Sequence, residues 1–467
     1  MVAEGGTSVA GTDRPWPLFP DGKGTVPTAD GGWLLACNHE VFDFQASLIP
    51  RGGASTVAFG AEGRITGSWP ILEGSHSNSR GAMTPWGTWL SCQEAHGSRE
   101  RVGGDGAGLV WECDPSGERP AMPRPALGVR THGSVAVDPA DGRCYLTEAH
   151  RDGRLYRFTP AHGGLTADSL AAGTLEAMVV GPDGGVSWQP VADPTGTVAP
   201  TRVQAAAATV TPMGGGVAVH DGTLWFTTGL DDRVHAVDLG AGRHRVVWDG
   251  TRRRRPLAGI GDLAVAPSGD VFVVEDRGDM EVVLLGPAAD GGAGTAAWPF
   301  CRLVGDGHRL SAVTGPCFDP SGSRMYVSSL RGRGEALVRD VVPELDWGDG
   351  AEGRHVGVTY EVTGPFRMPE AATGGNGSTV PATTTSVGPG TTVPATTPPA
   401  PPTPTSEGTV APPSTAPTTT GPPPTTTGAG TPGRRGNRGP GTATWGIGAA
   451  VLAAGGAVVA LRRRRGR

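Results

Sequence analysis

Residues 141–148 read DGRCYLTE, a glycine-containing turn followed by an apolar run and a closing polar residue. Five other stretches repeat this order, namely 30–38 (DGGWLLACN), 85–94 (PWGTWLSCQE), 221–228 (DGTLWFTT), 267–275 (PSGDVFVVE) and 320–328 (PSGSRMYVS). Their turn glycines are spaced by 55, 55, 80, 47 and 53 residues. Second and third short strands flank several units, as at 134–139 and 155–158. Repeats of about fifty residues built from strand, glycine turn, strand and polar loop are typical of β-propeller blades.

The six repeats therefore predict an all-β, six-bladed propeller. A β-sandwich is the alternative, but it does not explain six repeats in phase. An insertion around Gly173–Thr201 accounts for the longest spacing.

The closing polar residues of the six units are the first candidates for a functional site. Counting six or seven residues from each turn glycine gives Asn38, Glu94, Glu148, Thr228, Glu275 and Ser328. Equivalent positions in a propeller face one zone, so three carboxylates and an amide are expected to converge at the channel or at one rim. Converging carboxylates repel unless they share protons or bind a cation, and hard cations such as Ca²⁺ prefer oxygen ligands. For any one glutamate, a strand-end residue in solvent or paired with arginine is the competing interpretation.

Composition divides the chain into a folded part and a tail. Residues 1–370 contain aromatic and β-branched runs and are assigned to the propeller. Residues 371–444 are dominated by Thr, Pro, Gly and Ser, and such a segment buries too little apolar surface to fold, so we expect a disordered stalk. Eight of the 39 basic residues lie after Glu370 but only one of the 45 acidic residues does, so the propeller is acidic. Nucleic-acid binding, which needs a basic surface, is therefore not expected.

The end of the tail predicts a membrane anchor. Residues 445–461 form an uncharged run of 17 residues, and residues 462–467 are a basic tail that begins with four arginines. A run of this length is at the short end for a transmembrane helix, and basic flanks stay cytoplasmic. The predicted location is the cell surface, with the propeller outside. Residues 1–6 show no signal peptide, so we expect the start site to lie upstream.

Other side chains give weaker signals. The six cysteines have no C-x-x-C spacing, which argues against a zinc cage and leaves disulfide pairing open. Lys23 is the only lysine, and its surroundings are not those of a phosphate loop. The histidines at positions 39, 76, 132 and 150 lack a helical H-x-x-x-H pair, so they are interpreted as lone surface residues.

Several of the same stretches resemble the PhoX-type alkaline phosphatases, secreted bacterial β-propeller enzymes with a calcium–iron cluster in the central channel. The resemblance spans about 33–332. It is carried by NHE at 38–40, TPWGTWL at 84–90 with Glu94, AVDP at 136–139 through YLTE at 145–148, ED at 275–276 and GPCF at 315–318. It implies phosphomonoester hydrolysis by a metal cluster that orients the phosphate and stabilises its transition state.

The chain also departs from the family pattern. The cysteine that ligates iron in the family is replaced by Ser79, a weaker ligand for Fe³⁺ than a thiolate, and Arg80 adds a permanent positive charge next to it. The family's acids are missing at Gly133, before the GPCF motif at 312–314, and in the stretch 212–215. These changes argue against Fe³⁺ and leave Ca²⁺ as the favoured ion if a metal is bound.

Two functions follow. The first is a membrane-tethered, metal-dependent phosphoester hydrolase, with a phosphoester substrate. Its predicted metal ligands are Asn38, Glu40, Glu94, Glu148 and Glu275. Arg80 is predicted to bind the substrate's phosphate. The second is a catalytically silent surface propeller with a binding or structural role, in which Arg80 supplies the charge of the metal. The sequence does not determine the oligomeric state.

Overall fold

The computed structural model describes most of the predicted propeller, namely residues 1–41, 52–94, 108–251, 257–287, 295–308, 311–332, 357–364 and 366–368. The predicted stalk, membrane anchor and basic tail all lie outside the described residues. Within those residues, no helix is long and apolar enough to cross a membrane.

The strands form six antiparallel sheets. Blade 1 contains β2 (Pro20–Pro27), β3 (Trp33–His39), β4 (Gly53–Phe59) and β5 (Ile65–Leu72). Blade 2 contains β6 (Asn78–Met83), β7 (Trp89–Gln93), β8 (Val110–Cys113) and β9 (Met122–Pro123). Blade 3 contains β10 (His132–Val137), β11 (Cys144–Glu148), β12 (Leu155–Pro160), β13 (Gly173–Val180) and β14 (Val186–Pro190).

Blade 4 contains β15 (Gly214–His220), β16 (Thr223–Thr228), β17 (Arg233–Asp238) and β18 (Arg243–Asp249). Blade 5 contains β19 (Ile260–Val265), β20 (Val271–Glu275), β21 (Glu281–Pro287) and β22 (Thr295–Arg302). Blade 6 contains β23 (Val313–Phe318), β24 (Arg324–Ser329), β25 (Val358–Thr363) and β1 (Ala3–Glu4). The helical segments are short: α1 (Thr201–Gln204) and the 3₁₀ turns η2 (Pro125–Leu127), η3 (Ala167–Leu170) and η4 (Asp306–His308).

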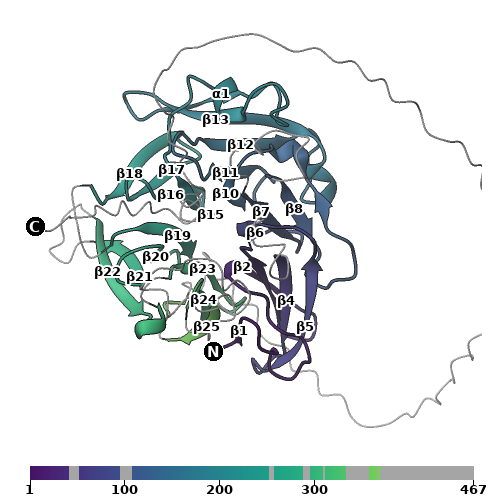
Figure 1. Ribbon diagram of the computed structural model, residues 1–467. Helices are drawn as coiled ribbons and strands as arrows, with labels where there is room; N and C mark the ends of the chain where they lie inside the picture. The colour runs from purple at the N-terminus through teal and green to yellow at the C-terminus, as the bar shows by residue number, and fades with distance from the viewer. Residues whose placement is uncertain are drawn as a thin grey trace, which may run out of the picture. The chain divides into compact units, whose positions relative to one another are not determined.

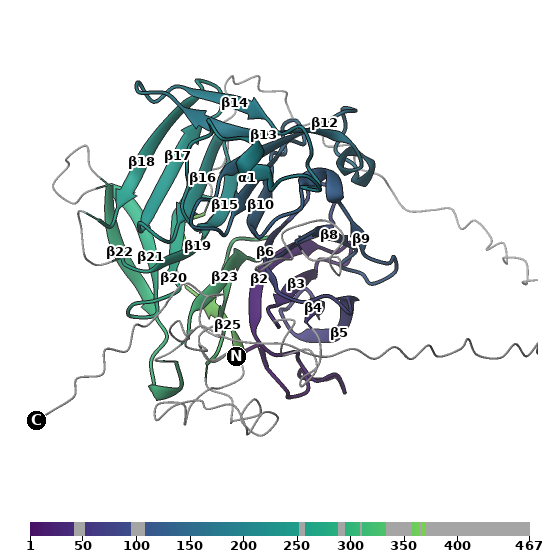
Figure 2. The same cartoon turned by 45° about the horizontal axis from the view of Figure 1, so that its top comes forward.

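The sheets close into a ring around a central channel (Figures 1 and 2). The first strands of successive blades, β2, β6, β10, β15, β19 and β23, contact one another in order, and β23 contacts β2 again. The N-terminal strand β1 completes blade 6 by pairing with β25, with Ala3 opposite Thr359. The six-bladed propeller predicted from the turn glycines is confirmed. The predicted insertion corresponds to the extra strand β14 and to α1.

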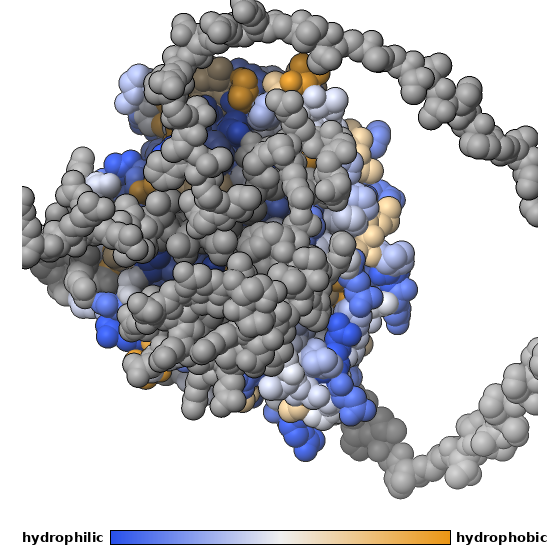
Figure 3. All heavy atoms as spheres, in the orientation of Figure 1, coloured by the Kyte–Doolittle hydropathy of each residue, from blue (hydrophilic) through white to orange (hydrophobic). Residues whose placement is uncertain are grey.

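The core consists of apolar layers between neighbouring blades. One layer, which includes Leu90 and Leu146, joins blades 2 and 3, and another, which includes Tyr145 and Phe226, joins blades 3 and 4. Tyr145 and Leu146 are adjacent in β11, so both faces of this strand are buried. Inner strands therefore appear in the sequence as continuous apolar runs rather than as alternating patterns. At the edge of blades 1 and 2, the surface seen in Figure 3 is mostly hydrophilic.

The six cysteines occupy these layers. All are free thiols, and all except the half-buried Cys301 are buried. Burial raises the pKa of Cys37 and Cys317 to about 12, so these thiols remain protonated at neutral pH. They pack as small apolar side chains.

Candidate functional site at the channel mouth

Every inner strand contains a β-bulge at the same place. In β2 the register shifts between Pro20 and Lys23, so that two residues lie opposite the single residue Asn38. Equivalent shifts occur in β6, β10, β15, β19 and β23. The bulged pairs are Asp21-Gly22, Ser79-Arg80, Gly133-Ser134, Gly215-Gly216, Gly261-Asp262 and Gly315-Pro316. Because all inner strands begin at the same end of the channel, the bulges form a ring, which we call the channel mouth.

Glycine at the bulges allows neighbouring backbones to approach closely. A Cβ at Gly133 would lie 2.1 Å from the carbonyl oxygen of Gly214, and a Cβ at Gly215 would lie 2.1 Å from that of Gly261. A larger side chain does not fit at either position without a backbone shift. An acid at position 133 therefore requires the neighbouring backbone to shift. Only the β6 bulge lacks glycine, and it carries Arg80.

Arg80 lies among carboxylates from other blades. Its side chain is about 10% exposed, and its Nε atom lies 3.7 Å from Oδ2 of Asp262 in β19. Its Nη2 atom lies 3.6 Å from Oδ2 of Asp276, which directly follows β20. Both distances are longer than a hydrogen bond, and Nε has no hydrogen-bond partner among the described residues.

The charges at the mouth influence one another strongly. Burial raises the pKa of Asp21 to about 7, although the Arg80 guanidinium acts to lower it. Burial together with Asp21 and Glu94 raises the pKa of Glu40 well above its usual range. Burial alone would lower the pKa of Arg80, but the surrounding carboxylates, Asp276 first, raise it, so Arg80 stays charged. The mouth therefore holds more acidic groups than its buried arginine neutralises.

Lys23 is a second buried cation, which sequence reasoning dismissed. It is 5% exposed, and its Nζ atom donates hydrogen bonds to the backbone carbonyls of Asp21 and, at 3.3 Å, of Thr314. The clue available in the sequence was that the only lysine lies between two glycines in what becomes an inner strand. The histidine interpretation was also wrong for three of the four residues, because His39, His76 and His132 are buried.

Asn38 holds the β6 bulge in place. Its Nδ2 atom donates to the backbone carbonyls of Ser79 at 2.7 Å and Arg80 at 3.1 Å. Its Oδ1 atom accepts the indole N–H of Trp89 at 2.8 Å. The amide thus connects β3 to the next blade and fixes the backbone from which Arg80 extends.

The predicted glutamates separate into two groups. Glu40 and Glu94 are buried and follow β3 and β7 directly, and their carboxylates interact electrostatically with each other and with Arg80. Glu148 and Glu275 end β11 and β20, where their carboxylates already bind local groups. Glu148 accepts hydrogen bonds from the Tyr156 hydroxyl at 2.8 Å, the Arg202 guanidinium at 2.9 Å and the Arg154 backbone N–H at 3.2 Å.

Glu275 accepts three backbone N–H groups, from Ala258, Asp279 and Glu281, at 2.9–3.2 Å. Burial nevertheless raises its pKa to about 7. The expectation that the six closing polar residues occupy equivalent positions in their blades is met only in part. Glu148, Thr228, Glu275 and Ser328 each pair with the residue just before a bulge, whereas Asn38 and Glu94 are offset by one position. The paired residue follows the turn glycine by six residues in blades 2 to 6 and by seven in blade 1. The count of seven in blade 2 and of six in blade 1 therefore missed the paired residues Gln93 and His39 by one position each.

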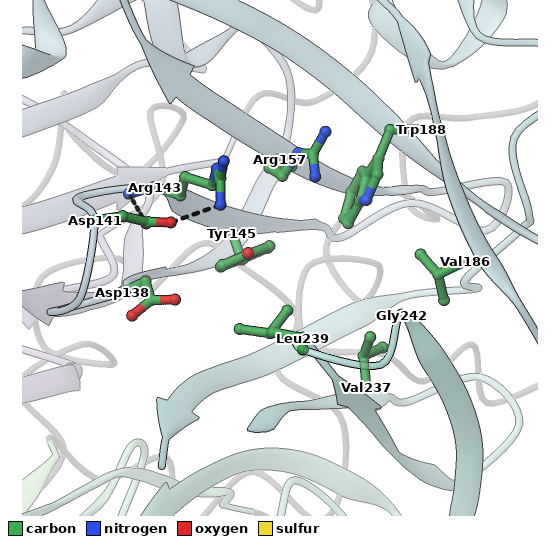
Figure 4. Close-up of a pocket in the computed structure, with 11 residues that line it drawn as sticks. Asp138, Asp141, Arg143, Tyr145, Arg157, Val186, Trp188, Val237, Leu239 and Gly242 are labelled. Atoms are coloured by element: carbon green, nitrogen blue, oxygen red, sulfur yellow. Dashed lines mark hydrogen bonds and ion pairs between the residues drawn. The ribbon is translucent and has the colours of Figure 1, made fainter. Parts of the chain in front are cut away.

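A separate pocket of about 250 Å³ lies between blades 3 and 4 (Figure 4). Tyr145 and Trp188 line it, together with Asp138, Asp141 and Arg143 from the turn between β10 and β11. This turn is at the opposite end of the inner strands from the mouth. The pocket contains none of the predicted site residues.

Comparison with known proteins finds one family that matches part of the chain. The family described as alkaline phosphatase PhoX matches residues 50–227, a stretch that includes Ser79, Arg80, Glu94 and Glu148. Over this region the chain is similar to the PhoX family. A structure of Pseudomonas fluorescens PhoX in complex with vanadate, a transition state analogue, is 14% identical with a TM-score of 0.55, covering 75% of this chain and 89% of that one.

Two other solved structures are less similar. A luciferin-regenerating enzyme is 12% identical with a TM-score of 0.39, covering 76% of this chain and 94% of its own. The calcium-binding protein regucalcin from Agrobacterium tumefaciens is 16% identical with a TM-score of 0.34, covering 75% of this chain and 93% of its own. Neither carries any argument here. No curated protein matches the chain.

The calcium–iron cluster implied by PhoX does not fit the described residues as they stand. At the position of the iron-ligating cysteine, the Ser79 hydroxyl donates to the Gly133 carbonyl at 3.5 Å. The Arg80 guanidinium lies between Asp262 and Asp276, and Glu148 is paired with Arg202. In the part of the chain that the structure describes, no three His, Cys, Asp or Glu side chains are grouped to hold a metal ion.

Proposed function

We propose that this chain is an extracytoplasmic PhoX-type phosphoester hydrolase, with its reaction site at the channel mouth. The observation that carries the proposal is the PhoX match over residues 50–227, which includes the mouth residue Arg80. Three features of the mouth support it: a buried arginine, the carboxyls around it, and their position at one end of a propeller channel.

Arg80 has the properties of a phosphate-binding group. Its ion pairs with Asp262 and Asp276 are longer than hydrogen bonds, so its N–H donors are not used by those carboxylates. A guanidinium with available donors binds phosphate oxygens in a bidentate manner. In this proposal water attacks phosphorus and releases a proton to solvent, while the P–O bond to the alcohol breaks. Arg80 binds the phosphoryl oxygens and stabilises the charge that develops on them during this step.

Asp21 is the proposed proton donor. Because burial raises the pKa of its carboxyl to about 7, the group is about half protonated at neutral pH. A protonated carboxyl beside the bound phosphate is suited to protonate the departing alcohol. In this proposal Arg80 binds the phosphate and Asp21 supplies the proton.

The test is hydrolysis by the purified full-length protein of p-nitrophenyl phosphate and of bis-p-nitrophenyl phosphate, each with CaCl₂ and with EDTA. We expect turnover of the monoester, and a loss of roughly 100-fold in kcat/KM for Arg80→Gln. Arg143→Gln removes the same charge from an exposed turn far from the mouth and should leave the rate unchanged. Absence of turnover of both esters under both conditions would refute the hydrolase.

A specific observation favours the second candidate, a catalytically silent surface propeller. The ion pairs of Arg80 with Asp262 and Asp276 already balance part of the charge that a metal cluster would balance in PhoX. In this case the mouth has a binding or structural role, and the same assay gives no hydrolysis.

We also propose that the protein is tethered to the membrane, with the propeller at the cell surface. The support is the sequence alone: the Thr/Pro-rich stretch 371–444, the apolar run 445–461 and the basic tail 462–467. Protease added to intact cells should release a soluble fragment that contains the propeller and leave the C-terminal tail in the membrane fraction. Recovery of the whole chain, uncleaved, in the soluble fraction of lysed cells would contradict the tether.

A further inference from the structure

The mouth contains a charge arrangement that a typical buried ion pair does not have. Arg124 and Glu112 form such a pair in blade 2, in direct contact at 2.6 Å. Arg80 instead lies between two carboxylates, from β19 and from the residue after β20, at nearly equal distances of 3.7 and 3.6 Å. One cation shared by several carboxylates is the arrangement expected around a metal ion rather than within a pair.

Two of the carboxylates around Arg80 are buried and make few other hydrogen bonds among the described residues. Asp21 is 2% exposed, and its Oδ1 atom has no hydrogen-bond partner among the described residues. Asp262 is 6% exposed, and among the residues that the structure describes its carboxylate accepts a hydrogen bond only from the N–H of Leu263, its neighbour in β19. Buried carboxylates require a counter-charge or a proton, and of the two buried cations at the mouth, Arg80 and Lys23, Arg80 has the larger electrostatic effect on both.

The backbone holds Arg80 in this position. Asn38 accounts for both carbonyls of the bulge, and Gly22 packs so closely that a Cβ there would lie 2.5 Å from the Arg80 Cα atom. The backbone bulge that carries Arg80 is therefore held by close contacts, and it positions the guanidinium among the carboxylates.

We infer that Arg80 is the resident cation of the channel mouth, and that its guanidinium takes the place of a divalent metal ion among Asp21, Asp262 and Asp276. The described residues therefore differ from the PhoX cluster in one specific way. At this position the positive charge belongs to a side chain of the protein instead of an exchangeable metal ion. The inference concerns charge balance and holds whether or not the protein hydrolyses phosphoesters.

Removal of the guanidinium should turn the mouth into a cation site. Arg80→Gln keeps much of the side-chain volume but removes the guanidinium from among the three carboxylates. It leaves Lys23, which donates to the backbone carbonyls of Asp21 and Thr314, as the remaining buried cation at the mouth. Oxygen ligands in such an arrangement suit Ca²⁺. A ligand that binds only the folded state stabilises it by mass action, so the variant should gain a dependence on Ca²⁺ that the wild type lacks.

The experiment compares the melting temperature of the full-length protein in EDTA and in CaCl₂. We expect the Ca²⁺-induced increase to be larger in Arg80→Gln than in the wild type by about 5 °C. Terbium, a luminescent substitute for Ca²⁺, should show one more bound ion in the variant. Arg124→Gln also removes a buried arginine, but from a pair outside the mouth, and should behave as the wild type does.

A triple variant keeps the test decisive if Arg80→Gln folds poorly. Adding Asp262→Asn and Asp276→Asn to Arg80→Gln removes two of the carboxylates together with the cation. This triple variant should fold in EDTA, and its Ca²⁺-induced increase in melting temperature should be no larger than that of the wild type. The inference is overturned if the Ca²⁺-induced increase in Arg80→Gln is no larger than in the wild type. It is also overturned if the triple variant shows the same enlarged Ca²⁺-induced increase in melting temperature as Arg80→Gln. A third contrary outcome is that Arg80→Gln folds poorly and Ca²⁺ does not restore its folding, while the triple variant folds in EDTA.

Discussion

The Asp21→Asn substitution tests the electrostatics of the mouth directly. Asp21 is almost completely buried next to Arg80, and burial raises the pKa of its carboxyl from 3.8 to about 7. Asparagine has nearly the same shape and does not titrate. The substitution therefore separates the ionisation of this carboxyl from the packing of the site.

The sign of the effect follows from linkage between protonation and folding. Below pH 3.8 the carboxyl is protonated in both the folded and the unfolded protein, so its ionisation contributes nothing. Between pH 3.8 and about 7 the unfolded chain releases the proton while the folded protein retains it, so the wild type becomes progressively less stable. Above about pH 7 the carboxyl is ionised in both states, and the loss of unfolding free energy reaches its full value.

The difference between 3.8 and about 7, at about 1.4 kcal/mol for each pH unit, gives about 4 kcal/mol. Relative to the wild type, Asp21→Asn should gain this amount of unfolding free energy between pH 4 and pH 8, measured by denaturant unfolding across that range. Any constant offset from changed contacts with Arg80 cancels in the comparison. Parallel profiles for the two proteins would show that burial does not perturb Asp21 and would refute the electrostatic account of the mouth.

Glu118→Gln is the matched control, because this carboxylate is exposed in the turn before β9. It removes one acidic group far from Arg80. Its profile should run parallel to that of the wild type.

Three further substitutions test the framework of the mouth by denaturant unfolding. Asn38→Ala leaves an indole N–H and two backbone carbonyls without their partner, and should lower the unfolding free energy by about 3 kcal/mol or more; an effect within error would show that the bulge does not depend on this amide. Glu148→Ala removes the acceptor of hydrogen bonds from the Arg202 guanidinium and the Tyr156 hydroxyl and should lower it by about 3 kcal/mol, whereas a neutral result would contradict a structural role for this carboxylate. Gly215→Ala places a methyl group 2.1 Å from a carbonyl oxygen of the next blade and should be strongly destabilising, while Gly163→Ala, which meets nothing within 4 Å, should be nearly neutral. Equal stability of the two alanine variants would contradict the close approach of the inner strands.

Much of the fold could be predicted because each blade repeats a local pattern. A strand buried on both faces is apolar throughout, as in β11, and a glycine at each turn separates it from the strand before. Both features are local in the chain. Closure of blade 6 was not predicted, since Ala3 and Thr359 lie near opposite ends of the predicted propeller, residues 1–370, and β1 has only two residues.

The site was predictable only in part. Glu40, Glu94 and Arg80 were identified from the sequence, and all are buried and interact at the mouth. Asp21 and Asp262 were missed because a bulge, unlike a turn glycine, has no clear signature in one sequence.

The sequence by itself determined that this chain repeats one β-unit six times, that its tail has a different composition from its folded part, and that Arg80 follows a serine where the family has a cysteine. Only the tertiary structure decided which groups surround Arg80. Asp21, Arg80 and Asp262 lie on three different blades and are far apart in the chain. They meet because six bulges begin at the same end of one ring, and glycines such as Gly215 let the inner strands approach closely enough to bury the charges together.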